Sequence, residues 1–479
     1  MNAPITRLFG LVVLLFAVLV FATSWWTEFG AQRLRDNPLN RRELLEQAKI
    51  KRGKITAKDG SVLARSVKAQ GDTYRRIYPS NIFSHEVGYS FTNLGQTGLE
   101  RSRNDVLTGQ VSGEVDTLIN QISGKKKAGD DLVTNLDPAA QKVALQQLAG
   151  RKGSVVAMEP ATGKVRVMAS VPGFDQNQVP NHFKQLNKDK NAPLLNRSTQ
   201  AGYPPGSTFK VVTAAAALDT GQFTPDSTIN GDSGKKISGV PLANDGGQDF
   251  GDITLTDALT HSVNTVFGQL GEKLGKSTMA TYMERFGFYR KPPLDYPNDQ
   301  KRASGEYSSK GRLLSPTSGS IDVGRMAIGQ DKLNVTPLQM AEVAATVANH
   351  GVRVKPRLTQ KWVDPDGRTV STIQPQTAAR VMKRSTADEL TAMMSKVVQE
   401  GTGTAGALQG IDVAGKTGTA EIDVNNNITQ PWFIAFAPIK NPRVAIAVTV
   451  ERSQGGFGGT VAAPIAKAVM EQLLRGGGQ

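Results

Sequence analysis

The chain has 479 residues, of which 39% are hydrophobic and 21% are charged, an ordinary balance for folded domains. Its 57 basic and 42 acidic side chains give a formal charge of +15, but the basic residues are scattered and no zinc-finger or RNP signature accompanies them. Cysteine is absent, which excludes thiol catalysis, disulfides and thiolate metal sites, and the four histidines lack the helical spacing of a zinc site. We therefore expect about three folded units with no nucleic-acid partner, no metal and no cofactor.

An uncharged stretch near the N-terminus, Leu8 to Trp26, is long enough to cross a membrane. At about 1.5 Å per residue it spans roughly 28 Å as a helix, close to the ~30 Å hydrocarbon core. Trp25 and Trp26 stand at one end, where indole rings favour the membrane interface. A cleavable signal peptide is the rival interpretation, since Ala22 to Ser24 are small, but the run exceeds the roughly 7–15 residues of a signal core. We predict an uncleaved single-pass anchor.

The chain divides into three predicted parts. Residues 1–26 hold the anchor, residues 27–135 form a small strand-rich domain that begins with a polar helix over 27–51, and residues 136–479 mix helices and strands. Charge gives a conflicting indication of orientation, because only Arg7 precedes the apolar stretch while four arginines follow it closely. By the positive-inside rule this would leave the large part in the cytoplasm, although the rule is weak when a long domain follows the anchor.

Local signals predict several elements of the third part. Asp137 and Pro138 fit the N-cap and first position of a helix that runs to Leu148. Two β-type runs, 154–158 and 164–170, are joined by a short turn containing proline and glycine, which is typical of a hairpin. A last helix is expected over 460–474.

The sharpest chemical signal is Ser207-x-x-Lys210 within the run YPPGSTFKVVTAAAA. The prolines and glycine favour a stop before a helix, and the i, i+3 spacing places hydroxyl and amine on one face of its first turn. The alanine run lets the helix lie in a core, where burial would lower the Lys210 pKa so that a neutral amine takes the proton of Ser207. The helix N-terminus also directs backbone N–H groups at an anion forming there. Taken alone, Ser207 is more often a simple N-cap, and S-x-x-K recurs at Ser123 and Ser233 without a following helix.

Two further motifs favour the catalytic interpretation of Ser207 over the N-cap interpretation. The first is Ser262-Val-Asn264, and the second, later in the chain, is the run Lys416, Thr417, Gly418 and Thr419. A strand carrying Lys-Thr-Gly can line a cleft with a cation, hydroxyls and a backbone N–H. Each motif alone is readily a loop cap or a solvated strand charge, but the ordered trio is the active-site set of the penicillin-recognising serine acyltransferases. His261 adjoins Ser262 in sequence and so does not face it, which argues against a Ser–His pair.

With these motifs the chain resembles the class B penicillin-binding proteins, which are monofunctional DD-transpeptidases. The resemblance covers nearly the whole chain. In the N-terminal region it rests on Arg52-Gly53-x-Ile55-x-x-x-Asp59-Gly60 and on Gly95-x-x-Gly98-Leu99-Glu100. In the C-terminal region it rests on Ala169–Asn177, Asn196-Arg197, Ile328–Gln330 and Val335–Ala341.

The resemblance implies an α+β fold of the DD-peptidase/β-lactamase type, an antiparallel sheet with helices on both faces, behind an anchor and a pedestal or dimerisation-like domain. Ser207 would attack the penultimate D-alanine of a peptidoglycan stem peptide, with Lys210 as general base. Ser262 would relay the proton to the leaving amine, and Asn264 would hold the substrate amide. A second stem peptide would then supply the amine that completes a cross-link.

The third motif would bind the substrate carboxylate. The resemblance implies that Lys416 supports the proton network and offsets the carboxylate charge, while Thr417 and Thr419 hydrogen-bond it and Gly418 lies between them. The backbone N–H groups of Ser207 and Thr419 would form the oxyanion hole. β-Lactams would mimic D-alanyl-D-alanine and acylate the serine.

This chemistry places the catalytic domain outside the membrane, against the charge count. A polytopic glycosyltransferase of the RodA/FtsW type is the implied partner, because nothing in the chain resembles a glycosyltransferase domain. A β-lactamase shares the motifs, but no glutamate stands out for the fast deacylation that class A enzymes perform. A DD-carboxypeptidase differs only in using water as acceptor and stays open, as does a non-catalytic scaffold or β-lactam sensor, although no catalytic residue is missing.

Overall fold

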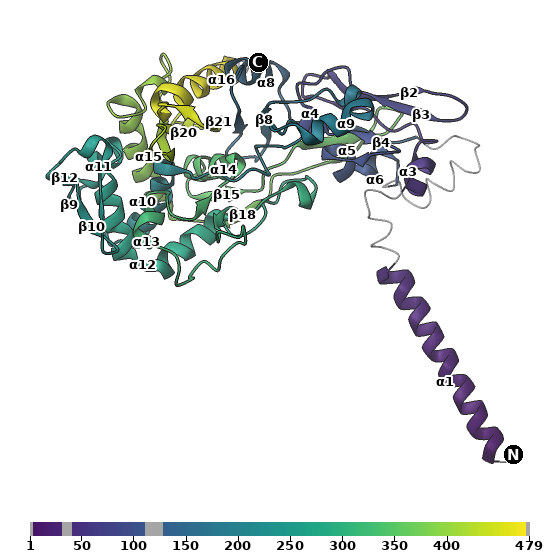
Figure 1. The fold of residues 1–479 in the computed structure, drawn as a ribbon. Helices are drawn as coiled ribbons and strands as arrows, with labels where there is room; N and C mark the ends of the chain where they lie inside the picture. Colours follow the sequence, from purple (N-terminus) through teal and green to yellow (C-terminus); the bar gives the residue numbers. More distant parts are fainter. Residues whose placement is uncertain (1–2, 31–40, 111–127, 476–479) are drawn as a thin grey trace.

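The computed structural model describes residues 3–30, 41–110 and 128–475. Its first element, α1 (Ala3–Trp25), continues through a π-helical turn, η1 (Trp26–Gly30), and has no buried residue. Ala3–Glu28 is long and apolar enough to cross a membrane, which agrees with the predicted anchor (Figure 1). Of the helix expected over residues 27–51, the structure shows the rest of η1 at its start and α3 (Arg41–Gln47) toward its end, while residues 31–40 lie outside the described residues. The helix ends at Gln47, before the predicted end at residue 51.

The N-terminal domain is built on a six-stranded sheet, with β1 and β6 parallel and the other neighbours antiparallel. Its strands, in spatial order, are β17 (Thr369–Thr372), β16 (Thr359–Val363), β6 (Asp131–Thr134), β1 (Ile55–Thr56), β2 (Val62–Lys68) and β3 (Tyr74–Ile77). Two of these strands come from far beyond residue 135. The predicted division at 135 therefore misses that the stretch 359–372 folds back onto the N-terminal sheet.

Small elements complete this domain. They are α4 (Ser84–Val87), α5 (Gly98–Ser102), α6 (Asn104–Leu107) and the hairpin β4 (Ser90–Phe91) and β5 (Gly95–Gln96). Glu100 of α5 is fully buried and forms ion pairs with Arg52 (3.0 Å) and Arg76 (2.6 Å). The two N-terminal sequence motifs are thus joined, since Arg52 belongs to one and Glu100 to the other.

The C-terminal domain contains a fully antiparallel sheet in the order β19-β20-β21-β7-β8. Its strands are β7 (Gly153–Met158), β8 (Val165–Val171), β19 (Ala414–Asp423), β20 (Ile428–Ala437) and β21 (Val444–Val450), with the short β22 (Ser453–Gln454) paired to β20. β7 and β8 form the predicted hairpin. The sheet brings the beginning and the end of the domain together.

Helices cover both faces of this sheet, as predicted (Figure 1). Side chains alternate along β20, so that Ile434 joins the core packed against α14 (Pro337–Ala348) and Ala435 joins the core packed against α8 (Pro138–Gln147) and α16 (Ala463–Arg475). The cap of α8 is also as predicted, because the Asp137 side chain accepts a hydrogen bond from Ala140 N at 3.0 Å. The sequence prediction of an α+β fold of this type is confirmed.

A helical region lies against the α14 side of the sheet. Its helices are α10 (Lys210–Asp219), α11 (Leu255–Thr260), α12 (Asn264–Phe286, interrupted at Gly275), α13 (Val323–Ala327) and α15 (Arg384–Gln399), while α9 (Val179–Lys188) lies elsewhere, beside the N-terminal domain in Figure 1. Two-stranded ladders pair β9 (Thr228–Asn230) with β12 (Asp252–Thr254), β10 (Lys235–Ile237) with β11 (Val240–Leu242), β13 (Gly305–Glu306) with β14 (Leu333–Asn334) and β15 (Val352–Val354) with β18 (Thr377–Arg380). Short 3-10 turns are η2 (Gln176–Gln178), η3 (Gly206–Phe209), η4 (Asp245–Gly247), η5 (Asn298–Gln300) and η6 (Thr404–Gly406), and a π-helical turn, η7 (Gly458–Ala462), precedes α16.

Polar contacts join the two domains. The Asn177 side chain donates to Tyr78 O (2.8 Å) and accepts from Tyr78 N (3.1 Å), so it pairs with the backbone at the end of β3. Arg103 forms a half-buried ion pair with Asp295 at 2.9 Å. These contacts, and the strands β16 and β17 that join the N-terminal sheet, hold the two domains together.

Candidate active site

The turn that carries Ser207 is fixed from two sides. It is η3, which leads directly into α10, a helix whose residues are all buried, as the alanine run predicts. Trp432 Nε1 donates to Pro204 O at 2.9 Å, and Gly206 N donates to Gly329 O at 3.1 Å. Ser207 is half-buried between these anchoring contacts. The turn therefore presents the serine from a rigid support.

Glycine is required where this turn meets its neighbours. Gly206 has φ +52°, and a Cβ there would lie 2.8 Å from Thr419 O on β19. A Cβ at Gly329 would lie 2.0 Å from Gly206 O. Close backbone approach without side chains brings the turn against the Lys-Thr-Gly strand.

Lys210 is completely buried, and its amine is directed toward the second motif. Nζ donates to Ser262 O (2.6 Å) and Asn264 Oδ1 (2.7 Å), lies 3.3 Å from Ser262 Oγ and stands 5.5 Å from the centre of the Phe267 ring. Within the described part of the chain, it makes no hydrogen bond to Ser207 Oγ. Burial, helped by the charge of Lys416, lowers the pKa of Lys210 well below its usual value, in the direction that the sequence predicted.

Ser262 lies between two amines. Its Oγ is 2.9 Å from Lys416 Nζ and 3.3 Å from Lys210 Nζ. Its backbone has φ +61°, a left-handed conformation that costs about 1–3 kcal/mol for a residue with a side chain. This conformation lies in the turn between α11 and α12, and Asn264 begins α12 with its Nδ2 bonded to Ala243 O at 3.0 Å. The strained turn is thus what aims both the hydroxyl and the carbonyl of Ser262 at the lysines.

Lys416 is also completely buried, on β19, and donates to Thr417 O at 3.0 Å in addition to Ser262. Burial lowers its pKa to about 7. The hydroxyl of Thr417 is 2.5 Å from that of Thr402, and the hydroxyl of Thr419 accepts from Gly458 N at 3.2 Å. A Cβ at Gly418 would lie 2.8 Å from Pro205 O, so this strand runs directly beside the serine turn.

The structure therefore brings together all eight residues of the three predicted motifs: Ser207, Lys210, Ser262, Asn264, Lys416, Thr417, Gly418 and Thr419. The other S-x-x-K at Ser233 enters β10 with no helix, and the one at Ser123 lies outside the described residues. His261 is exposed and stacks on Phe250, with ring centres 6.1 Å apart, as a surface residue would.

Sequence reasoning missed two supporting residues. Thr402 orients Thr417, and Trp432 holds the backbone ahead of Ser207. The sequence from Trp432 to Ala437 is of β type, but nothing in it indicates that the Trp432 indole reaches residue 204. Neither partner stands near its target in sequence, so only the folded chain identifies them.

Residues 153–471 match the penicillin-binding protein transpeptidase domain, and residues 52–132 match the penicillin-binding protein A dimerisation domain. The peptidoglycan D,D-transpeptidase PbpA of Mycolicibacterium smegmatis is 35% identical over 518 residues, covering 100% of both chains. This confirms the similarity to penicillin-binding protein A of actinobacteria that the short N-terminal region and single anchor predict.

Solved structures give the same answer. A ceftriaxone acyl-enzyme of penicillin-binding protein A from Mycobacterium tuberculosis has a TM-score of 0.81 and 32% identity, covering 90% of this chain and 100% of that one. A D,D-transpeptidase domain from Eggerthella lenta has a TM-score of 0.78 and 33% identity, with the same coverage. The chain therefore belongs to the class B penicillin-binding protein transpeptidases, with a dimerisation domain ahead of the catalytic one.

Proposed function

We propose that this chain cross-links peptidoglycan stem peptides as a serine D,D-transpeptidase, with Ser207 as the nucleophile. The observation that carries the proposal is the position of Ser262 Oγ between two buried amines, 3.3 Å from Lys210 Nζ and 2.9 Å from Lys416 Nζ. That arrangement supplies a base, a relay and a cation without histidine, cysteine or metal.

Lys210 is the general base for acylation. A neutral amine has two N–H groups and one lone pair, and the two short contacts to Ser262 O and Asn264 Oδ1 take both N–H groups. The lone pair is then left to accept a proton, and burial lowers the pKa and so favours the neutral amine. Ser207 Oγ loses its proton to Lys210 as it bonds to the carbonyl carbon of the penultimate D-alanine. The resulting oxyanion is bound by the backbone N–H groups of Ser207 and Thr419.

Collapse of the tetrahedral intermediate breaks the peptide bond and releases D-alanine. The leaving nitrogen needs a proton, which passes from Lys210 through the Ser262 hydroxyl. Lys416 donates to the same hydroxyl and steadies it during the transfer. Asn264 holds the amide of the donor peptide, and the site is left with an ester at Ser207.

The carboxylate of the terminal D-alanine is bound along β19. Lys416 supplies the positive charge, and Thr417 and Thr419 supply hydroxyls on either side of Gly418. The amine of a second stem peptide then attacks the ester, forms the cross-link and returns the proton to Ser207 through Lys210. A β-lactam carries a comparable carboxylate and acylates Ser207 by the same first step.

The substrate fixes the orientation that we propose for the chain. Stem peptides lie outside the cytoplasmic membrane, so the catalytic domain is extracytoplasmic and α1 is its single-pass anchor. A RodA/FtsW-type glycosyltransferase is the proposed partner that supplies glycan strands.

The test is the intact mass of the full chain before and after benzylpenicillin, with Ser207→Ala as the matched variant. A lasting mass gain equal to the drug, absent from the variant, is the expected result. Hydrolysis of the drug without a lasting adduct would instead indicate a β-lactamase. No adduct and no hydrolysis would contradict the catalytic assignment. A stem-peptide donor offered with and without an acceptor D-amino acid then separates transpeptidation from carboxypeptidation.

A further inference from the structure

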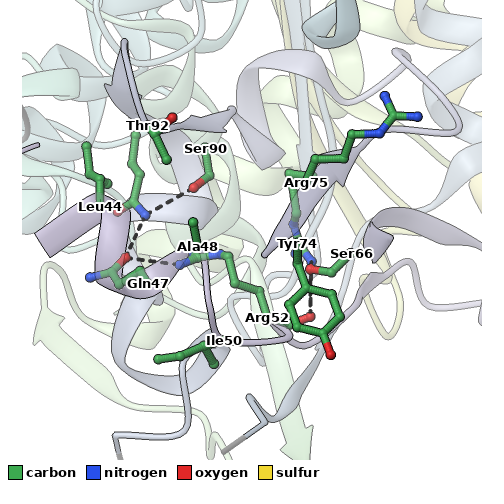
Figure 2. Close-up of a pocket in the computed structure, with 12 residues that line it drawn as sticks. Leu44, Gln47, Ala48, Ile50, Arg52, Ser66, Tyr74, Arg75, Ser90 and Thr92 are labelled. Carbon is green, nitrogen blue, oxygen red and sulfur yellow. Dashed lines mark hydrogen bonds between the residues drawn. The ribbon is translucent and has the colours of Figure 1, made fainter. Parts of the chain in front are cut away.

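The N-terminal domain contains a small cavity that the transpeptidase chemistry does not use (Figure 2). Its volume is about 40 Å³, enough for a few water-sized groups. Apolar side chains from α3 and the residues just after it contribute to the lining. Arg75 and Arg76 of β3, together with Arg52, also contribute. The lining is formed by Leu44, Gln47, Ala48, Ile50, Arg52, Ser66, Tyr74, Arg75, Arg76, Ser90, Thr92 and Gln96.

Two of the lining arginines share one carboxylate behind the cavity. Arg52 donates to Glu100 Oε2 through Nε (3.2 Å) and Nη2 (3.0 Å), and Arg76 donates to Glu100 Oε1 through Nε (2.6 Å). Both arginine side chains are nearly inaccessible, at 7% and 2%, and Glu100 is at 0%. The cluster therefore buries two positive charges with one negative charge.

The second guanidinium is also short of hydrogen-bond partners. Arg76 Nη1 donates to Arg52 O (3.3 Å) and Ser66 Oγ (3.2 Å), but Arg76 Nη2 is buried without a hydrogen-bond partner among the described residues. Within the part of the chain that the structure describes, no carboxylate lines the cavity. Arg75 extends away from the cluster in Figure 2, so it adds positive potential without using up the space.

A guanidinium cannot escape this situation by losing its proton, because arginine stays protonated in proteins. Glu100 cannot supply more charge: burial favours its neutral form, but Arg76 and Arg52 outweigh that effect, lower its pKa and keep it ionised. A buried, unmatched guanidinium with a free N–H group is costly, and an anion that reaches it removes that cost.

We propose that this cavity binds one carboxylate group against Arg76, whose Nη2 has no accessible surface in the structure and turns toward the anion when it binds. One unmatched charge calls for a monoanion. Because Arg76 Nε and Nη1 are already engaged, the carboxylate is held through a charge-assisted hydrogen bond from Nη2. The aliphatic side chains of Leu44, Ala48 and Ile50 on the α3 side suit a short apolar stem behind the anion (Figure 2). The carboxylate is that of a free short-chain acid or of an acidic side chain in another polypeptide segment.

Two probes distinguish these sources, measured by isothermal titration with the detergent-solubilised full chain. Propionate stands for the free acid, and the peptide Ac-Ala-Glu-Ala-NH2 stands for the side chain. Chloride at equal ionic strength is the control for propionate, because it is an anion without a carboxylate. Ac-Ala-Gln-Ala-NH2 is the control for the glutamyl peptide, because its side chain is uncharged. The variants are Arg76→Met, which leaves Arg52 and Glu100 as a balanced pair, and Arg65→Met, which removes an exposed arginine from neighbouring β2.

We expect at least one carboxylate probe to bind, with the dissociation constant raised tenfold or more by Arg76→Met and unchanged by Arg65→Met. Tighter binding of the glutamyl peptide than of propionate identifies a polypeptide carboxylate, and equal binding identifies a free acid. Arg76→Lys keeps the positive charge but loses the planar guanidinium, so it should bind with intermediate affinity. This variant keeps the test valid if Arg76→Met misfolds. Circular dichroism checks the folding of both variants. If neither probe binds better than its control, or if Arg76→Met binds equally well, water alone fills the cavity and the proposal is wrong.

Discussion

Two buried clusters, one in each domain, surround a single oxygen-bearing side chain with a pair of cationic residues. In the catalytic domain Lys210 and Lys416 surround Ser262, and in the N-terminal domain Arg52 and Arg76 surround Glu100. Burial lowers the pKa of both lysines, to about 7 for Lys416, so those side chains give up their charge more readily than an exposed lysine does. The arginines keep theirs and require a counter-ion.

The difference explains why one cluster can move protons while the other can only hold structure or bind an anion. A hydroxyl between two neutral or half-charged amines can pass a proton in either direction. A carboxylate between two guanidinium groups stays ionised and fixes the two N-terminal sequence motifs to each other. In this chain the cluster with lysines is suited to proton transfer, and the cluster with arginines is suited to holding structure.

The largest expected effect is on catalysis. Lys210→Arg places a permanently charged group in the base position, so acylation by benzylpenicillin should slow by about 10²–10⁴-fold. The measurement is the rate of adduct formation by intact mass. Lys236→Arg is the matched control, because it changes the exposed lysine of the other S-x-x-K and should leave the rate unchanged. A Lys210→Arg rate within a few fold of the wild type would mean that Lys210 is not the base.

The corresponding change in the N-terminal cluster should affect stability instead. Glu100→Gln leaves two buried guanidinium groups without a counter-ion and should lower the free energy of unfolding of that domain by about 3–5 kcal/mol. Urea denaturation measures it. Glu46→Gln, which breaks the exposed pair with Lys49, should cost less than about 0.5 kcal/mol. Equal effects of the two changes would show that the buried cluster carries no special weight.

Acidity should also act on this cluster in a defined direction. Because the folded pKa of Glu100 is lowered, its stabilising contribution is present above the unfolded carboxyl pKa and is lost as pH falls through the folded value. The wild type should therefore lose more stability on acidification than Glu100→Gln does. Urea midpoints that fall in parallel for the two proteins as the pH is lowered would contradict this expectation.

A smaller effect concerns Lys416. With a pKa of about 7, its amine is charged below neutral pH and loses its charge above it. The second-order rate constant for acylation by an anionic β-lactam should therefore fall by roughly tenfold per pH unit above the pKa, since that constant reports the free enzyme. Lys416→Arg should move this alkaline decline to higher pH, even if its rate at pH 6 is lower. A wild-type profile that stays flat to pH 9 would rule out a titrating Lys416.

The smallest effect tests the support of the third motif. Thr402→Val removes the hydroxyl that orients Thr417 and should weaken saturable binding of the β-lactam by about 2- to 10-fold, the value of one hydrogen bond. Thr404→Val, at a nearby exposed threonine, should have no effect. Stopped-flow acylation over a range of drug concentrations separates binding from the chemical step. An unchanged dissociation constant for the β-lactam in Thr402→Val would mean that Thr417 does not need the hydrogen bond from Thr402.

Local signals account for what the sequence predicted well. The prolines and glycine before Ser207 mark the start of a helix, the alanine run buries it, and Asp137 caps α8 as its residue type suggests. Each of these depends on residues a few positions apart. The three motifs could be placed in one site only through the family resemblance, because their separation along the chain exceeds any local rule.

Non-local effects account for what was missed. Pairing of β16 with β6 joins Thr359 to Thr134, and no periodicity in either strand indicates that partner. The left-handed backbone at Ser262 is unusual for serine and is imposed by the surrounding helices. The direction of the Lys210 amine, toward Ser262 and Asn264 and not toward Ser207 alone, likewise depends on where α12 begins.

The proposed catalytic mechanism requires a Lys210 that is neutral in the resting protein. The direct test is a pH titration of the lysine side-chain carbons by NMR in the full chain labelled with [13Cε]lysine, with the Lys210 signal assigned from its absence in Lys210→Arg. We predict that this signal has the chemical shift of a neutral amine at pH 7 and titrates well below the ordinary lysine pKa. A signal that titrates near the ordinary lysine value of about 10.4 would contradict the account, since a protonated Lys210 cannot take the proton of Ser207.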